Sequence, residues 1–137
     1  MWNVAIKSLV CTCIGHTDVV AAVAAMPDGQ RILSGSNDKT VRVWLLDGTL
    51  QNTFSELHDA GAEVSALVAL PDNQHALSAA FDNTVKLFNV NDGTVLRTFT
   101  HHIRAVRCLA LLPDGLRFVS ASGDHTAKIV EHGLAPP

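Results

Sequence analysis

The chain has 137 residues, of which 47% are hydrophobic and 17% are charged, and its formal net charge is −3. This length and composition correspond to one folded domain and exclude a disordered protein. The acidic balance argues against nucleic acid as a partner, because binding to phosphates requires clustered Lys and Arg. The longest apolar run, residues 19–26, is too short to span a membrane, so we expect no membrane association.

The cysteines Cys11, Cys13 and Cys108 are odd in number and lack the spacing of a disulfide framework or a zinc site. We therefore expect reduced thiols and a cytoplasmic protein, with the nucleus as the alternative. Cys11 and Cys13 would lie on the same face of a strand, where small packing residues are the simplest interpretation. We expect neither a metal nor a cofactor.

The first expected element, residues 1–14, is an outer strand, because Trp2-Asn3-Val4 aligns with Phe88-Asn89-Val90. Repeat units over residues 15–55, 56–100 and 101–131 follow it, with a tail over 132–137. The units are aligned by two residues that recur at intervals of 44 and 42, namely Pro27, Pro71 and Pro113, and Asp38, Asp82 and Asp124. This spacing is typical of repeat architectures built from one small unit.

Each unit begins with an apolar run, such as residues 19–26, that ends at a Pro-Asp-Gly or Pro-Asp-Asn turn. Runs this short are marginal as helices and ordinary as strands. Two further strands follow in each unit, as at 31–36 and 40–44, and Asp-Gly turns then lead to a fourth strand in the first two units. The sequence predicts an all-β fold of four antiparallel strands per unit, with three strands in the last.

Several residues of the first unit indicate a family. Gly15-His16 begins the unit, Asp38 precedes its third strand, and Trp44 ends that strand. With its period and strand pattern, the chain resembles the WD-repeat β-propellers. The Trp is replaced by Phe88 and Val130 in the later units. The Asp that follows Trp in the family is also absent, with Leu45, Asn89 and Glu131 in its place.

The resemblance implies that a Ser, a His and an Asp form a structural hydrogen-bond network in each blade, joined by Trp44 in the first. A catalytic interpretation of the same residues lacks the nucleophile elbow and oxyanion hole that hydrolases need. We therefore predict no catalytic residues. The expected network residues are His16, Ser34, Asp38, Trp44, His58, Ser78, Asp82, His102, Ser120 and Asp124.

Three blades are too few to close a ring, so both terminal blade faces need a cover. The resemblance implies that residues 1–14 can serve as the fourth strand of a last blade. Two arrangements fit: a homodimer that completes a six-bladed ring, or a chain that is a piece of a longer propeller.

The resemblance implies a non-enzymatic scaffold that binds a protein or peptide at its loop rim, the end of the blades that carries the second-to-third-strand loops and the links into each inner strand. Rim positions that change from unit to unit are the candidate contacts: Asp18, Asn37, Phe81 and Arg104. A two-residue insertion near 59–64 should protrude there. The alternatives are a decayed repeat copy with a structural role only, and an enzyme that uses the central funnel.

Overall fold

The computed structural model describes Leu9 and residues 11–55, 57–58 and 62–134, which contain eleven β-strands and no helix. No membrane-spanning helix therefore occurs among them. The strands are β1 (Val20–Ala25), β2 (Arg31–Ser36), β3 (Val41–Leu45), β4 (Leu50–Phe54), β5 (Val64–Ala69), β6 (His75–Ala80), β7 (Val85–Asn89), β8 (Val95–Phe99), β9 (Val106–Leu111), β10 (Arg117–Ser122) and β11 (Ala127–Glu131).

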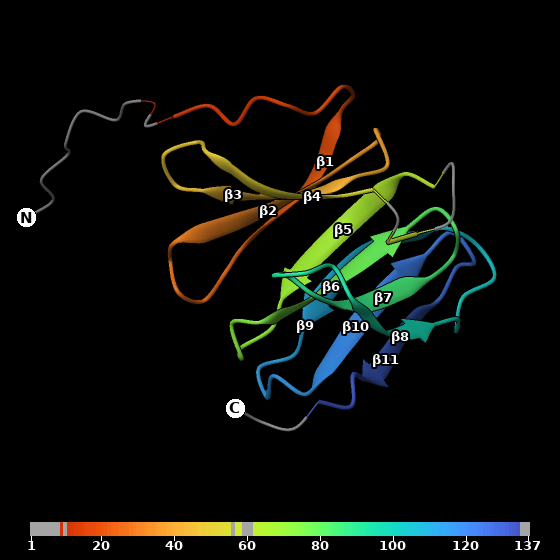
Figure 1. Cartoon of the computed structure of the whole chain (residues 1–137). Coiled ribbons are helices and arrows are strands. Elements are labelled where there is room, and N and C mark those ends of the chain that lie inside the picture. The colour runs from red at the N-terminus through yellow and green to blue at the C-terminus, as the bar shows by residue number, and fades with distance from the viewer. Residues whose placement is uncertain (1–8, 10, 56, 59–61, 135–137) are drawn as a thin grey trace, which may run out of the picture.

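The strands form three antiparallel sheets in chain order: β1–β4, β5–β8 and the three-stranded β9–β11. The expectation of propeller blades is confirmed, and the described residues supply three strands of the third blade. The sheets stack as an arc in which the inner strands β1, β5 and β9 follow one another, as Figure 1 shows.

The alanine-rich run β1 is a strand because a tight turn returns the chain directly onto it. Met26 N donates to Arg31 O at 2.9 Å, and the Asp28 carboxylate accepts from the Gln30 amide at 2.8 Å. Backbone hydrogen bonds along β2 then fix the register. Strand pairing of this kind overrides the helix propensity of alanine, since short helices are marginal without tertiary support.

Apolar residues between the sheets hold the arc together. One cluster joins the first and second blades and includes Leu33, Val43 and Phe88, while a second joins the second and third blades and includes Leu77 and Phe118. Each contact buries the side chains that alternate onto one face of a sheet, and the second blade is covered on both faces, so β6 is buried at five consecutive residues.

The first face of the arc is open. Val23 of β1 is 70% exposed, whereas its counterparts in the next two blades, Leu67 and Leu109, are 7% and 9% exposed because a preceding blade covers them. Burial of such positions is the main favourable term in folding. The face that bears Val23 therefore has the character of an inter-blade contact without its partner.

The last face is open in the same way. Ile129 of β11 is 64% exposed, while its counterparts Val43 and Leu87 are fully buried by the blade that follows them. Each contact between successive blades pairs a face like that of Ile129 with a face like that of Val23. The two open faces are therefore of the two kinds that pack against each other within the chain.

Residues 1–8 and 10 of the expected outer strand lie outside the described residues, and residues 11–14 are not in a strand. The described part nevertheless lies beside the first blade: Cys11 Sγ donates to Leu46 O at 3.0 Å. A Cβ on Gly48 would lie 3.2 Å from the Thr12 carbonyl oxygen. In the next blade the corresponding glycine, Gly93, lies against Phe54 of the preceding blade's outer strand. Residues 11–12 therefore occupy the place of an outer strand that precedes the first blade.

The expected tail begins with ordered structure. His132 is buried, its backbone amide donates to Leu116 O at 3.1 Å, and its Nε2 lies 2.6 Å from Gly115 O. Leu134 packs against the second cluster. The last blade therefore extends past residue 131, and residues 135–137 lie outside the described part.

We predict that Leu77→Ala lowers the free energy of unfolding by about 2–5 kcal/mol, because it leaves a cavity between two blades. Leu96→Ala on the exposed outer strand β8 is the matched control and should change it by less than about 0.5 kcal/mol. Urea denaturation followed by circular dichroism measures both. Equal losses in the two variants would contradict the assignment of stability to the contact between blades.

Candidate functional site

The first blade contains a chain of hydrogen bonds that runs inward from its rim loop. His16 Nδ1 lies 2.8 Å from Asp38 Oδ2, and His16 Nε2 lies 2.6 Å from Ser34 Oγ. Trp44 Nε1 donates to the same Ser34 Oγ at 2.7 Å. Because the carboxylate only accepts, His16 Nδ1 carries a proton, and Ser34 Oγ accepts from the indole. In the neutral imidazole with this tautomer, Ser34 donates to Nε2.

The second and third blades repeat this arrangement without the indole. His58 lies 3.0 Å from Asp82 Oδ2 and 2.7 Å from Ser78 Oγ. His102 lies 2.7 Å from both Asp124 Oδ2 and Ser120 Oγ. In each blade a threonine two residues after the Asp also donates to the carboxylate, as Thr40 does to Asp38 at 2.6 Å. Each of the three polar sets is thus internally satisfied, as buried polar groups require.

The order Asp–His–Ser is that of a hydrolase triad, but the position of the serine argues against such chemistry. Ser34 is 6% exposed, Ser78 and Ser120 are still less exposed, and Ser34 also accepts from Trp44. A nucleophilic serine must reach a substrate carbonyl near an oxyanion hole. Serines buried between strands can tie a rim loop to the blade but cannot attack a substrate.

Hydrogen bonds to two network carboxylates outweigh the effect of burial on their acidity. Burial raises the pKa of Asp38, yet hydrogen bonds from Thr40, His16 and the Thr17 amide hold this pKa well below its ordinary value of 3.8. Hydrogen bonding from Thr126, followed by that from His102, lowers the pKa of Asp124 in the same way. Both networks therefore depend on an ionised carboxylate.

The predicted contact positions lie at matching places on the loop rim. Asn37 N donates to Val19 O at 2.8 Å, Phe81 N to Glu63 O at 3.0 Å, and Gly123 N to Ala105 O at 3.0 Å. The same backbone hydrogen bond thus presents a different side chain in each blade. Asp18 and Arg104, which precede the inner strands of the first and third blades, are both exposed at this rim.

Phe81 is 44% exposed, and the Arg107 guanidinium carbon lies 5.5 Å from the centre of its ring. This is a cation–π arrangement across the boundary between the second and third blades. The arginine thus packs over the ring, while much of the ring remains exposed at the rim.

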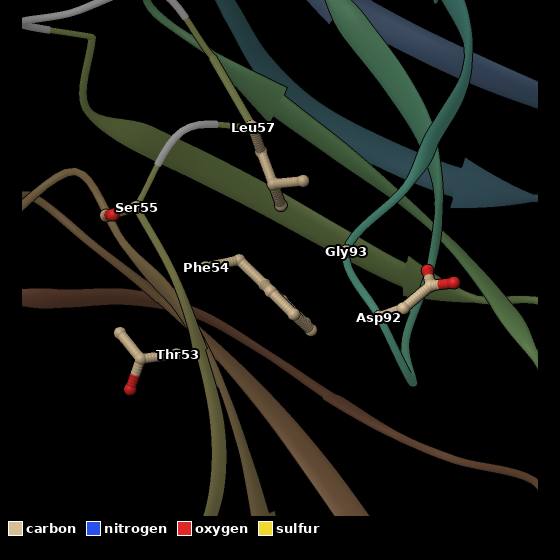
Figure 2. Close-up of a pocket in the computed structure, with 6 residues that line it drawn as sticks. All are labelled: Thr53, Phe54, Ser55, Leu57, Asp92 and Gly93. Carbon is tan, nitrogen blue, oxygen red and sulfur yellow. The ribbon is translucent and has the colours of Figure 1, made fainter.

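Hollows lie at the rim of the third blade and between the first two blades. The hollow at the rim of the third blade has a volume of about 420 Å³ and is lined by Arg104, Ala105, Arg107, Gly123 and His125. The other, about 360 Å³, is lined by Thr53, Phe54, Ser55, Leu57, Asp92 and Gly93. Figure 2 shows its Phe54 ring extending toward the Gly93 backbone, so this second hollow is a seam between adjacent blades.

A family model described as "WD domain, G-beta repeat" matches residues 7–44, 48–89 and 93–131, which together make up most of the chain. The chain belongs to the WD-repeat family. The matched segments contain the eleven described strands except for Leu45, the last residue of β3. The resemblance inferred from Gly15-His16, Asp38 and Trp44 is thereby confirmed.

Solved and curated relatives agree with this assignment. The crystal structure of the WD40 β-propeller domain of Doa1 has a TM-score of 0.81 and 31% identity, over 90% of this chain and 40% of that one. Pre-mRNA-processing factor 17 of Saccharomyces cerevisiae is 28% identical over 90% of this chain and 27% of its own length. Apoptotic protease-activating factor 1 of Rattus norvegicus is 34% identical over 90% of this chain and 10% of its own. The chain therefore spans well under half of each of these relatives.

The alignment of the units alone places Gly123 at the rim position that Asn37 and Phe81 occupy in the other units. The sequence did not indicate the roles of Arg107 and His125, because Arg107 lies on an inner strand, where its direction is set by packing. The insertion expected to protrude near 59–64 falls largely on residues 59–61, outside the described residues.

We predict that Asp38→Asn lowers the free energy of unfolding by about 1–3 kcal/mol near pH 7, because it weakens four hydrogen bonds to a carboxylate. Since the pKa of Asp38 is lowered in the folded chain, its contribution is complete above about pH 4 and is lost as the pH falls through the folded pKa. The difference between wild type and variant should shrink over that range in urea titrations. A difference independent of pH would contradict the role of the ionised carboxylate.

Proposed function

We propose that the chain is a non-enzymatic interaction scaffold that holds a protein or peptide at its loop rim. The observation that carries this proposal is the set of equivalent rim positions, where one backbone hydrogen bond presents Asn37, Phe81 and Gly123 in turn. Loops on a rigid framework are the usual place for recognition. The half-exposed Phe81 ring, held by Arg107, supplies an aromatic anchor of the type that dominates protein interfaces.

The proposed contacts are Asp18, Asn37, Phe81 and Arg104. Asp18 and Arg104 are exposed at corresponding places and carry opposite charges, so they would orient an extended partner along the rim. The buried serines and their histidines serve the framework in this proposal, and the partner binds without chemical change. Free Cys11, Cys13 and Cys108 favour a compartment that keeps thiols reduced, the cytoplasm or the nucleus.

We further propose that the open faces of the isolated chain are covered by a second copy, in a six-bladed ring. Within the chain, the faces equivalent to that of Ile129 cover Leu67 and Leu109, the counterparts of Val23. The Ile129 face of one copy would therefore cover the Val23 face of the other. Residues 11–12 already lie where a preceding outer strand belongs, and the last blade is the one in which the described residues supply no outer strand. Head-to-tail contacts between identical copies form a closed ring when the rotation that relates one copy to the next completes a full circle.

We expect peptides selected on the wild-type chain from a random displayed library to lose most of their binding to Phe81→Ala. Loss of an aromatic anchor weakens an interface by about 2 kcal/mol or more. Arg117→Ala, at the opposite end of the third blade, is the control and should bind the same peptides unchanged. Peptides that bind both variants as they bind wild type would contradict the rim assignment.

The second-copy proposal predicts that the chain elutes with twice its mass of 14.6 kDa when size-exclusion chromatography is combined with light scattering. Ile129→Asp should convert it to monomer, because a charge would be buried in the contact. Ile103→Asp, at another exposed isoleucine outside the open faces, should leave the dimer intact. A monomeric wild-type chain would overturn the proposal and leave the blades of a longer protein as the cover.

A further inference from the structure

The third blade differs from the others by an empty side-chain position at its rim. Gly123 makes the backbone hydrogen bond that Asn37 and Phe81 make in the first and second blades. A Cβ at Gly123 would lie 3.7 Å from the Arg104 Cβ and from the Arg107 Nε, which are ordinary contact distances. Sterics therefore do not demand glycine here, and its effect is to leave the hollow of about 420 Å³ open.

The lining of this hollow concentrates positive charge on a chain whose net charge is negative. Arg104, Arg107 and His125 surround it. The corresponding residues are Asp18, Ala21 and Lys39 in the first blade, and Ala62, Ser65 and Asn83 in the second. Two arginines meet only in the third blade.

Neither guanidinium forms an ion pair with a carboxylate of the described residues. The neighbouring acid, Asp124, directs its oxygens to His102, Thr126 and the Ile103 amide. Arg107 lies over the ring of Phe81, which limits its motion without using its hydrogen-bond donors. The hollow is therefore lined by two guanidinium groups that make no ion pair with a carboxylate of the described residues, and the Phe81 ring limits the motion of one of them, Arg107.

We propose that this hollow binds the anionic group of a peptide side chain, a carboxylate or a phosphorylated hydroxyl, between Arg104 and Arg107. The guanidinium group presents paired donors that fit both kinds of oxyanion. The volume is within the range of small-ligand sites. This inference rests on the proposed function, since it names the chemistry of the peptide held at the rim.

A peptide fits the surroundings better than a nucleic acid. The pair of arginines lies within one hollow, whereas phosphate backbones are held by a line of basic residues. The adjoining Phe81 ring would pack against an apolar residue next to the anionic one.

Fluorescence anisotropy with labelled peptides tests the proposal on the whole chain. Three probes share the same Gly-Ser flanks and one leucine, and differ in a central run of glutamates, of phosphoserines or of glutamines. We expect the glutamate probe, the phosphoserine probe or both to bind at least about tenfold more tightly than the glutamine probe, as charge-assisted hydrogen bonds imply. The first two probes distinguish a carboxylate ligand from a phosphorylated one. Binding should weaken as salt is raised above about 0.15 M.

Two kinds of variant separate the hollow from general charge. Arg104→Ala and Arg107→Ala should each weaken binding of the anionic probe about tenfold, while Arg117→Ala, which removes the same charge elsewhere, should not. Gly123→Phe restores the residue type of the second blade and fills the hollow without changing charge, so it should also weaken binding. Gly123→Ala fills little space and is its control. Thermal melts followed by circular dichroism check that each variant folds.

Equal binding of the glutamine and anionic probes would overturn the inference, as would full binding by Gly123→Phe. A uridine oligonucleotide that competes as well as the anionic peptides would overturn it in favour of a nucleic-acid site.

If library-selected peptides still depend on Phe81 in any of these cases, rim binding stands and the anion site fails. If Arg107→Ala and Gly123→Phe abolish binding of the anionic probes while no selected peptide depends on Phe81, the anion site stands and the wider rim proposal fails.

Discussion

Contact between the faces of successive sheets is the interaction on which this structure depends. No blade has a core of its own, because each is a single layer of strands, and burial of Leu33, Leu77 or Phe118 requires a neighbouring sheet. The apolar area removed from water at these two contacts supplies the stability that hydrogen bonds within each sheet cannot. The exposed Val23 and Ile129 follow from the same rule at the two ends of the arc.

The polar networks have a different task from the apolar contacts. Each one ties the loop between the second and third strands of a blade to the link that enters its inner strand, through Asp38 and His16 in the first blade. A buried Ser–His–Asp chain is strong only when every member is satisfied, and the accompanying threonines complete it. The framework thereby gains loops of fixed shape, on which side chains that lie outside the networks can vary freely.

Variation at those places gives the rim its character. The same backbone hydrogen bond is made in all three blades, while the side chain at this position is an amide in the first, an aromatic ring in the second and absent in the third. The empty place at Gly123 and the ring of Phe81 are next to each other across a blade boundary and share Arg107. A repeat protein can build an asymmetric binding surface in this way without altering the backbone that supports it.

The sequence by itself determined the repeat unit and its strands, and its resemblance to the WD repeats implied the residues of the polar networks. The unit and its strands depend on local spacing, such as the Pro-Asp turns and the fixed distance to Asp38, and the same pattern occurs three times along the chain. Only the tertiary structure decided that Arg107 turns toward Phe81, that Gly123 leaves a hollow, and that His132 is buried against the turn between β9 and β10. These features depend on contacts between separate blades or beyond the last repeat, where side-chain direction is set by packing rather than by the period of the sequence.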